Sequence, residues 1–279
     1  MYGVVTRNVD ELNWSEFDRG FYEIKDVTGR RAEPVETGTN MMSCFGDTAR
    51  GELDSEMVPR TADGDRATRE QPYFDWGYIC PTRTAYREEL LDIVDDAVAH
   101  NPDLRIDDIG FPRAEYCYCE ACQAAFEQSS ISDWGDWRSS VITSFVREVS
   151  DRVPGRLSAT VYPNPFPGHL KQRAGVDLAA IEPHLDELVI PLYDLHYGTT
   201  YWLEILASGF EQRISISLSI ELYAVNVDLD RLAKATEVAA EYADDVFFGY
   251  DAGTGRGVIR RLHAEASEGD TYGSPENGQ

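Results

Sequence analysis

The run "TAYREELLDIVDDAVAHNPDLRIDDIGF" (84–111) joins two patterns of different period. Its first part (84–100) repeats apolar residues three and four positions apart, which predicts a helix with one buried face. Its last part, "LRIDDIGF" (104–111), is a short β-rich run of the kind that forms a buried strand. A helix that leads into such a strand is typical of parallel sheets whose strands are joined by crossover helices.

The same alternation extends in both directions along the chain. Five more runs are expected to be strands: "YGVVT" (2–6), "LSATVYP" (157–163), "ELVIPLYD" (187–194), "ISISLSIELY" (214–223) and "DVFFGYDA" (245–252), with helical patterns between them at 119–152, 201–210, 229–243 and 257–266. Six such repeats, with charged or aromatic residues at the strand ends, predict an α/β fold of the TIM-type (β/α)8 barrel class. A doubly wound open sheet is the alternative, but no Gly-rich phosphate loop follows any of these strands.

A full barrel needs eight strands, and only six are clear. The segment from about 20 to 80 is rich in Gly, Pro, Asp and Arg and is expected to be a long loop or lid. Either it supplies the other two strands or the barrel is incomplete at its N-terminus. The expected organisation is one barrel domain over residues 1–266 and a disordered tail at 267–279. An open barrel would expose two strand edges, one of them "YGVVT" (2–6), so either the segment 20–80 packs there or two subunits meet there. The second is favoured, which makes the protein a possible homo-oligomer.

The chain is strongly acidic, with 50 Asp and Glu against 25 Lys and Arg, of which three are lysines. A dense carboxylate surface repels nucleic acid and anionic membranes, so neither is expected as a partner. Scarce lysine with high acidity suits a halophilic cytosol, where salt screens self-repulsion, and an acidic mesophilic protein is the alternative. The start "MYGVVTRNVDEL" has no signal-peptide pattern and no run of 18 apolar residues occurs, so the expected location is cytoplasmic.

Three of the five cysteines fall within six positions of "EYCYCEACQAAF" (115–126). Cys117, Cys119 and Cys122 form a C-x-C-x-x-C cluster, and Cys80 in "YICPT" is a candidate fourth ligand. Four thiolates around one ion suit structural Zn²⁺, while Cys44 is left over. The alternatives are buried thiols, a disulfide with spare cysteines, or an iron–sulfur cluster.

The stretch "DDIGFPRAEYCYCEACQAAF" followed by "WGDWR" resembles the family-42 β-galactosidases, over about residues 75–150. In that family the fourth barrel strand ends in a catalytic acid, and a C-x-C-x-x-C zinc cluster follows, completed by an upstream cysteine. The resemblance implies a glycosidase with an acid/base after strand four and a nucleophile after strand seven. Counted backward from the last strand, these positions are Asp108 and Glu221. The family carries Asn-Glu where this chain has Asp107-Asp108, so the acid is shorter and its neighbour is charged.

Glycoside hydrolysis needs two carboxyl groups on either side of the scissile bond, and in a parallel barrel the strand ends share one rim. Asp108, Tyr193, Glu221 and Asp251 are therefore expected around that rim. Aromatic side chains stack on sugar rings, and polar ones bind hydroxyls. The candidate substrate-binding residues are Arg7, Asn8, Asp107, Arg113, Tyr162, Asn164, Tyr193, Asp194, His196, Tyr250 and Asp251.

The expected function is thus a glycoside hydrolase that acts on a small-molecule carbohydrate through two carboxylates. Two alternatives stay open. One is a catalytically degenerate barrel that binds a saccharide or a protein without turnover. The other is a hydrolase that uses Asp107, Asp108 and Asp194 as Mg²⁺ or Mn²⁺ ligands.

Overall fold

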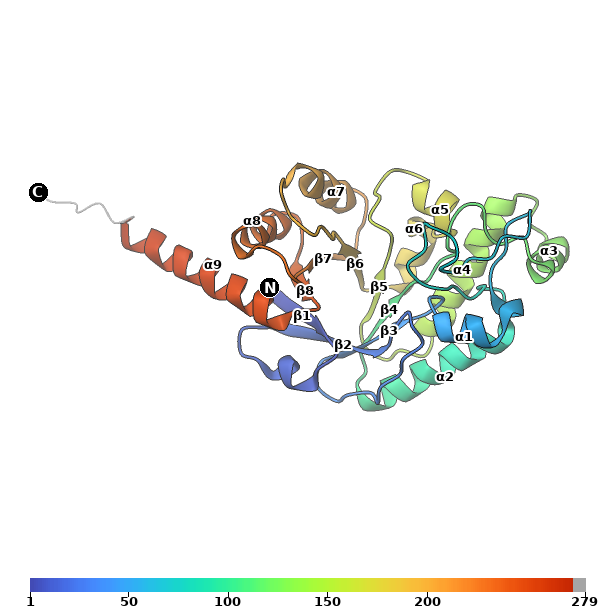
Figure 1. Ribbon diagram of the computed structural model, residues 1–279, viewed down its shortest axis with the longest axis horizontal. Helices are drawn as coiled ribbons and strands as arrows, with labels where there is room; N and C mark the ends of the chain where they lie inside the picture. The colour runs from blue at the N-terminus through green and yellow to red at the C-terminus, as the bar shows by residue number, and fades with distance from the viewer. Residues whose placement is uncertain (273–279) are drawn as a thin grey trace, which may run out of the picture.

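Eight parallel strands form a closed barrel in the computed structural model, which describes residues 1–272 and the side chains of residues 1–267 (Figure 1). The strands are β1 (Tyr2–Thr6), β2 (Arg19–Lys25), β3 (Thr39–Ser43), β4 (Leu104–Asp107), β5 (Leu157–Thr160), β6 (Glu187–Pro191), β7 (Ser217–Tyr223) and β8 (Asp245–Gly249). β1 pairs with both β2 and β8, which closes the ring. The predicted TIM-type (β/α)8 barrel is confirmed.

Helices surround the barrel. The α-helices are α1 (Thr48–Leu53), α2 (Thr84–His100), α3 (Glu120–Glu127), α4 (Trp134–Ser150), α5 (His169–Ala174), α6 (Leu178–Ile181), α7 (Tyr201–Glu211), α8 (Leu229–Ala240) and α9 (Ala252–Tyr272), with short 3-10 helices η1 (Val9–Asn13), η2 (Ser55–Met57) and η3 (Glu182–His184). The long helix α9 runs away from the barrel (Figure 1). The predicted tail at 267–279 therefore begins inside α9, and its residues 273–279 lie outside the described part of the chain.

The two strands that were not recognised, β2 and β3, lie in the segment predicted as a loop. Of the two alternatives, the first is confirmed, because this segment supplies the two strands. The alternative that the barrel is incomplete was wrong, and no edge of the barrel is left open for a second subunit. Val4 and Val5, expected at that edge, are fully buried in a strand paired on both sides. Residues 44–83 form the long connection between β3 and α2, and this connection carries α1 and η2.

The interior of the barrel is layered. A middle layer of apolar side chains comprises Val5, Phe21, Met41, Val189 and Phe247. These residues occupy inward positions on five different strands and separate two polar layers, one at each end of the barrel. The interior is therefore a packed core, as expected for an eight-stranded barrel.

The polar layer at the amino ends of the strands is an ion-pair network. Arg19 donates to both carboxylate oxygens of Glu187, at 3.0 and 2.9 Å, and also contacts Asp245. Ser158 and Ser219 donate their hydroxyls to the same Glu187 carboxylate. Every charge in this layer has an opposite partner, which is what a buried ionic cluster needs to be tolerated.

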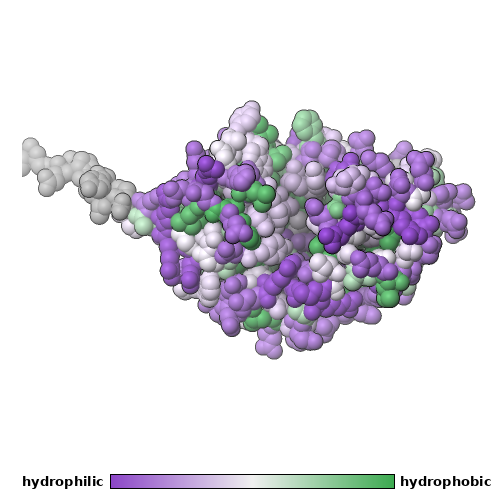
Figure 2. Space-filling model, in the orientation of Figure 1, coloured by the Kyte–Doolittle hydropathy of each residue, from purple (hydrophilic) through white to green (hydrophobic). Residues whose placement is uncertain are grey.

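The outer surface is mainly hydrophilic, with separate small apolar patches (Figure 2). This agrees with the excess of Asp and Glu over Lys and Arg. No helix in residues 1–272 combines the length and the apolar content that crossing a bilayer requires.

Candidate active site at the mouth of the barrel

Arg105 organises the polar layer at the carboxyl ends of the strands. Its side chain is buried, and its guanidinium carbon lies 4.7 Å from the centroid of the Phe21 ring below it. Nε and Nη2 donate to the two oxygens of Asp107 at 2.9 and 3.0 Å, and Nη2 also lies 2.6 Å from Glu221 Oε2. Thr160 adds a hydroxyl hydrogen bond of 2.6 Å to Asp107. One arginine therefore joins the ends of β4 and β7.

This shared partner fixes how close the two carboxylates are. Asp107 Oδ2 and Glu221 Oε2 lie 3.0 and 2.6 Å from the same Nη2 atom of Arg105, so they are at most 5.6 Å apart. Asp107 has both oxygens engaged by Arg105 and Thr160. Its role in the network is to hold the arginine, whose position in turn sets that of Glu221.

Glu221 points inward from β7 and is fully buried. Tyr193 follows β6, and its hydroxyl donates to the Oε1 atom of Glu221. The residue as a whole is 43% exposed. Gly249 on the neighbouring strand leaves the space that this carboxylate occupies, because a Cβ there would lie 2.7 Å from Glu221 Oε1. Tyr193 is thus the side chain between Glu221 and the solvent.

Asp108 turns away from this network. Its backbone is left-handed, with φ at +54°, a conformation that Asp tolerates better than most residues, and its Oδ2 accepts from Ser43 Oγ at 2.7 Å. Burial, and after it the charge of Asp107, raises the pKa of Asp108 to about 6. Asp108 is therefore a carboxyl group that can hold a proton near neutral pH, as a general acid must.

A second carboxyl group at the mouth has a raised pKa. Burial raises the pKa of Glu23, on β2, to about 7, against the lowering effect of its partner Arg7. The Arg7 guanidinium in turn lies 5.3 Å from the centroid of the Tyr250 ring. Asp26 and Asp107 add negative charge nearby. The mouth thus concentrates carboxyl groups whose charges are not fully balanced, which is common at functional sites.

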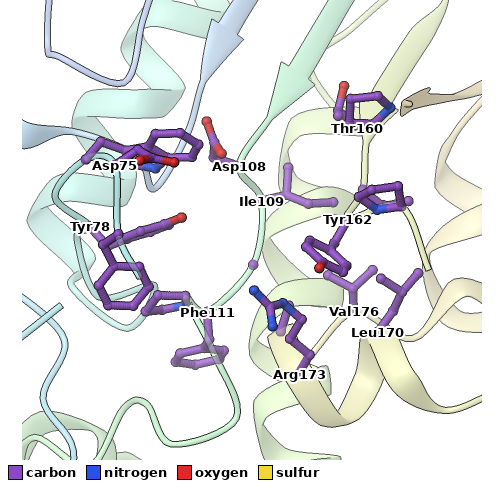
Figure 3. A pocket seen from close by; sticks show the side chains of 18 of the residues that line it. Asp75, Tyr78, Asp108, Ile109, Phe111, Thr160, Tyr162, Leu170, Arg173 and Val176 are labelled. Atoms are coloured by element: carbon purple, nitrogen blue, oxygen red, sulfur yellow. The ribbon is translucent and has the colours of Figure 1, made fainter. Parts of the chain in front are cut away.

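A cavity of about 350 Å³ opens beside this layer (Figure 3). It lies between the β3–α2 connection, which contributes residues 73–78, and the segments that follow β4 and β5. Asp108 and Thr160 line it, and so do Tyr78, Tyr162 and Arg173. Glu221 does not line the cavity. Hydrogen bonds and an ion pair connect Glu221 to the cavity through Arg105, Asp107 and Thr160. The volume lies within the range of small-molecule sites.

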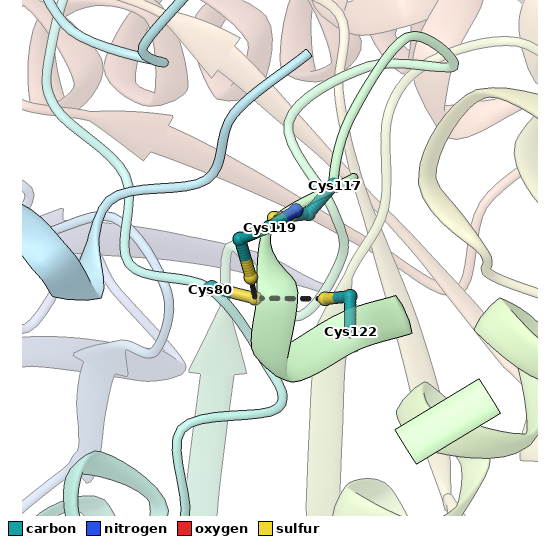
Figure 4. Close-up of side chains that lie close together, drawn as sticks. All are labelled: Cys80, Cys117, Cys119 and Cys122. Atoms are coloured by element: carbon teal, nitrogen blue, oxygen red, sulfur yellow. Dashed lines mark hydrogen bonds between the residues drawn. The ribbon is translucent and has the colours of Figure 1, made fainter. Parts of the chain in front are cut away.

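Four buried cysteines, from the end of the β3–α2 connection and from the start of α3 with the segment before it, lie close together (Figure 4). The Sγ atoms of Cys80, Cys117, Cys119 and Cys122 all lie within 4.8 Å of one another. The Cys80 sulfur is 3.3 Å from that of Cys122 and 3.9 Å from that of Cys119. The predicted ligand set is thus brought together as a group that could bind a metal ion. Cys44 lies outside it and is a separate buried thiol, as predicted.

The metal-dependent alternative is not supported by the geometry. The four cysteines are the only group of His, Cys, Asp or Glu side chains within residues 1–267 whose ligand atoms are close enough to share an ion. Asp107 is held by Arg105, and Asp194 accepts from the backbone of His196 at 2.9 Å. Asp107, Asp108 and Asp194 therefore do not form the predicted oxygen-donor set.

The predicted substrate-binding residues divide into two groups. Asp107, Tyr193, Arg7 and Tyr250 belong to the polar layer at the mouth, Tyr162 lines the cavity, and Arg113 lies beside it, paired with Glu115 and 4.6 Å from the Tyr73 ring centroid. The others are engaged locally. The side chains of Asn8, Asn164, Asp194 and Asp251 each accept from a backbone N–H two or three residues further on, and His196 is exposed.

Several residues of the mouth were not recognised in the sequence. Arg105 could have been found, because a charge inside a buried strand needs a partner. Glu23 and Lys25 lie on a strand that was read as loop. Lys25 is fully buried, pairs with Asp47 at 3.1 Å and donates to the carbonyl of Ser43, so it fixes the turn that follows β3.

No family model and no curated protein sequence matches this chain. Its fold is similar to solved structures of glycoside hydrolases. The PgaB (BpsB) glycoside hydrolase domain from Bordetella bronchiseptica has a TM-score of 0.66 at 10% identity, covering 96% of this chain and 97% of that one. Alpha-L-fucosidase isoenzyme 2 from Paenibacillus thiaminolyticus has 0.67 at 11%, covering 97% and 49%. A chitinase from Chromobacterium violaceum has 0.54 at 9%, covering 95% and 99%. These likenesses show the fold alone.

Proposed function

We propose that the protein is a glycoside hydrolase that acts on a small saccharide or glycoside at the mouth of the barrel. The observation that carries this proposal is that Glu221 of β7 and Asp107 of β4 share one buried arginine, while the next residue, Asp108, lines the adjoining cavity together with aromatic side chains. Two carboxyl groups that differ in protonation are the minimum that glycoside hydrolysis needs. The glycoside hydrolases of the same fold support the choice of reaction class.

The roles follow from the environments of the two carboxyl groups. Asp108, with its pKa near 6 and its place in the cavity, donates the proton to the departing glycosidic oxygen. Glu221, paired with Arg105, supplies negative charge to the sugar carbon as the bond breaks, either as nucleophile or as base for water. Tyr193 must move aside for a sugar to reach Glu221. The resemblance to family-42 β-galactosidases supports the same pair.

The cysteine group fits a structural zinc ion. Bonds of about 2.3 Å to a tetrahedral ion place the sulfurs about 3.8 Å apart, close to the distances found here. The N–H groups of Arg60 and Cys119 point to Cys117 Sγ at 3.3 and 3.4 Å, an outer hydrogen-bond shell that suits a thiolate. With four protein ligands the ion would have no open position. Its role would be to hold the 58–80 segment, one wall of the cavity, against the turn before α3.

The test is hydrolysis of a panel of nitrophenyl glycosides in low and in molar KCl, the second being the condition that the acidic composition favours. Glu221→Gln and Asp108→Asn should each lower kcat at least about 100-fold. Glu237→Gln, on the exposed face of α8, is the matched control and should leave the rate unchanged. Full activity in both site variants would contradict the proposal.

One observation favours a second candidate, a barrel that binds a saccharide without turnover. Glu221 is fully buried and engaged by both Arg105 and Tyr193, which is the environment of a structural carboxylate. In that case sugar binding would persist in the native chain while no glycoside in the panel is hydrolysed. Turnover that disappears in Glu221→Gln while sugar binding persists would exclude it.

A further inference from the structure

Arg173 is an arginine without an ionic partner inside the cavity. Its side chain makes neither an ion pair nor a hydrogen bond with any residue the structure describes, although acidic residues outnumber basic ones two to one in this chain. Its guanidinium carbon instead lies 4.1 Å from the centroid of the Tyr162 ring. Figure 3 shows its nitrogen atoms directed toward the open space, with the Tyr78 hydroxyl facing them from the other side.

The backbone that carries Arg173 is held rigidly. Arg138, a buried residue of α4, donates to the carbonyls of Gln172 and Arg173 at 2.9 and 3.0 Å, and to that of Arg113 at 2.9 Å. The helix α5 then ends at Gly175, whose positive φ of 71° suits glycine. The position of Arg173 is thus set by the fold before any ligand arrives, which lowers the entropy cost of binding.

We propose that Arg173 forms an anion subsite and that the sugar bound here carries a carboxylate or sulfate group. This inference rests on the proposed function in one respect, that the ligand is a saccharide. The planar guanidinium offers parallel N–H donors that match a carboxylate or sulfate, and a cation already stacked on an aromatic face is well oriented for such a contact. The ring of Tyr162, 47% exposed, offers the adjacent apolar surface for the sugar ring.

The other charges around the cavity sharpen this assignment. The acidic residues that line it are Asp75, which is exposed, and Asp108, which the mechanism uses as a proton donor. Arg113 lies near Arg173 and is paired with Glu115; the charge of Arg173 also helps to lower the pKa of Glu115, although these two residues form no ion pair. Arg173 is therefore the cation that remains available to a ligand, and a neutral sugar would leave its charge unused.

The experiment compares the binding of methyl glucuronide, glucose 6-sulfate and methyl glucoside to the whole chain by NMR titration at moderate salt. The native protein should bind at least one of the two anionic sugars about tenfold or more tightly than the glucoside, as a charge-assisted pair would. The two anionic probes separate a carboxylate preference from a sulfate preference. Arg173→Met should abolish the preference while leaving glucoside binding unchanged, and Arg173→Lys should keep part of it.

Arg147→Met, an exposed arginine on α4 without an ion pair in the described chain, is the matched control and should behave as the native protein. Equal affinity for the three sugars, absence of any sugar binding, or a preference that survives Arg173→Met would each overturn the proposal. The readout does not depend on turnover. Acid-sugar binding without hydrolysis would defeat the proposed function alone, and hydrolysis of neutral glycosides without an anionic preference would defeat the subsite alone.

Discussion

Each end of the barrel interior holds an ionic cluster, and the two clusters differ in how fully their negative charges are paired with positive ones. At the amino ends of the strands, Arg19 pairs with both Glu187 and Asp245, Arg156 and the amino terminus add the further positive charge, and two serines donate to Glu187. Although burial opposes it, the contact with Arg19 lowers the pKa of Glu187. At the mouth, burial raises the pKa of Asp108 to about 6 and that of Glu23 to about 7. A balanced cluster stabilises the fold, whereas carboxyl groups that can carry protons near neutral pH can do chemistry.

The same substitution at both ends provides the strongest test of this comparison. Glu187→Gln should lower the free energy of unfolding by about 3 kcal/mol, because it breaks a two-pronged ion pair with Arg19 and leaves a serine hydroxyl facing an amide N–H in place of an acceptor. Glu221→Gln should cost clearly less, because Arg105 loses one contact and keeps both of its hydrogen bonds to Asp107. Urea denaturation of both variants measures the difference. Equal losses would show that the mouth is as structural as the other end.

Removing the charge of Asp108 should stabilise the protein at high pH. The pKa of Asp108 is about 6 in the folded chain and about 3.9 in an unfolded one, so the folded chain holds this proton more tightly. Its contribution to the stability of the fold is therefore fully present below pH 4 and is lost as the pH rises through 6. Asp108→Asn should therefore raise the unfolding free energy at pH 8 by up to about 3 kcal/mol, with little change at pH 4. A gain that is the same at both pH values would contradict the raised pKa.

We expect the cysteine group to stabilise the mouth of the barrel and not the polar layer at the amino ends of the strands. Chelation of the proposed zinc ion, or Cys119→Ser, should speed amide exchange in residues 58–80 by about tenfold, since local opening there loses its restraint. The amides of β6 and β8 near Glu187 and Asp245 should exchange as before. Mass spectrometry of exchanged peptides measures both regions, and zinc analysis of the native protein should give about one ion per chain. Uniform acceleration across the barrel would show that the group supports the whole fold.

The smallest effect on the unfolding free energy is expected for an exposed lysine that forms ion pairs on the surface. Lys171 contacts Asp136 and Asp177 at 2.8 and 3.2 Å on the outer surface. Lys171→Met should change the unfolding free energy by less than about 1 kcal/mol, because water and salt screen such pairs. Thermal denaturation at two salt concentrations measures it. A larger loss would mean that surface pairs cannot be ignored in this acidic protein.

The sequence predicted six of the eight strands, including four that carry a buried charge, and it missed β2 and β3. β1 and α2 begin and end as predicted, because their burial follows a simple period. β2 was read as loop because Glu23 and Lys25 interrupt its apolar pattern, yet both lie inside the barrel. β3 (Thr39–Ser43) has five residues and little β-branched character. Two charges two positions apart in a short run leave too few apolar residues for the period of a strand to be recognised.

The candidate site was partly predictable. Asp108 and Glu221 were expected at the mouth from strand order and from the resemblance to family-42 β-galactosidases, and the ends of β4 and β7 do meet there through Arg105. Asn8, Asn164 and Asp251 were taken as binding residues but accept from nearby backbone N–H groups. A polar residue after a strand serves as a turn cap as readily as a ligand, and only tertiary contacts separate the two.

The Arg138 side chain binds carbonyls from the two segments that follow β4 and β5, at Arg113 and at residues 172–173 of α5, which lie far apart in the sequence. In evolutionary terms this makes the two segments dependent on each other. An insertion that shifts either segment removes a carbonyl acceptor from the buried guanidinium of Arg138. A change in the length of one segment should therefore be tolerated only together with a change in the other. Variation in what the barrel recognises should therefore come from the 58–79 segment opposite, which Arg138 does not touch.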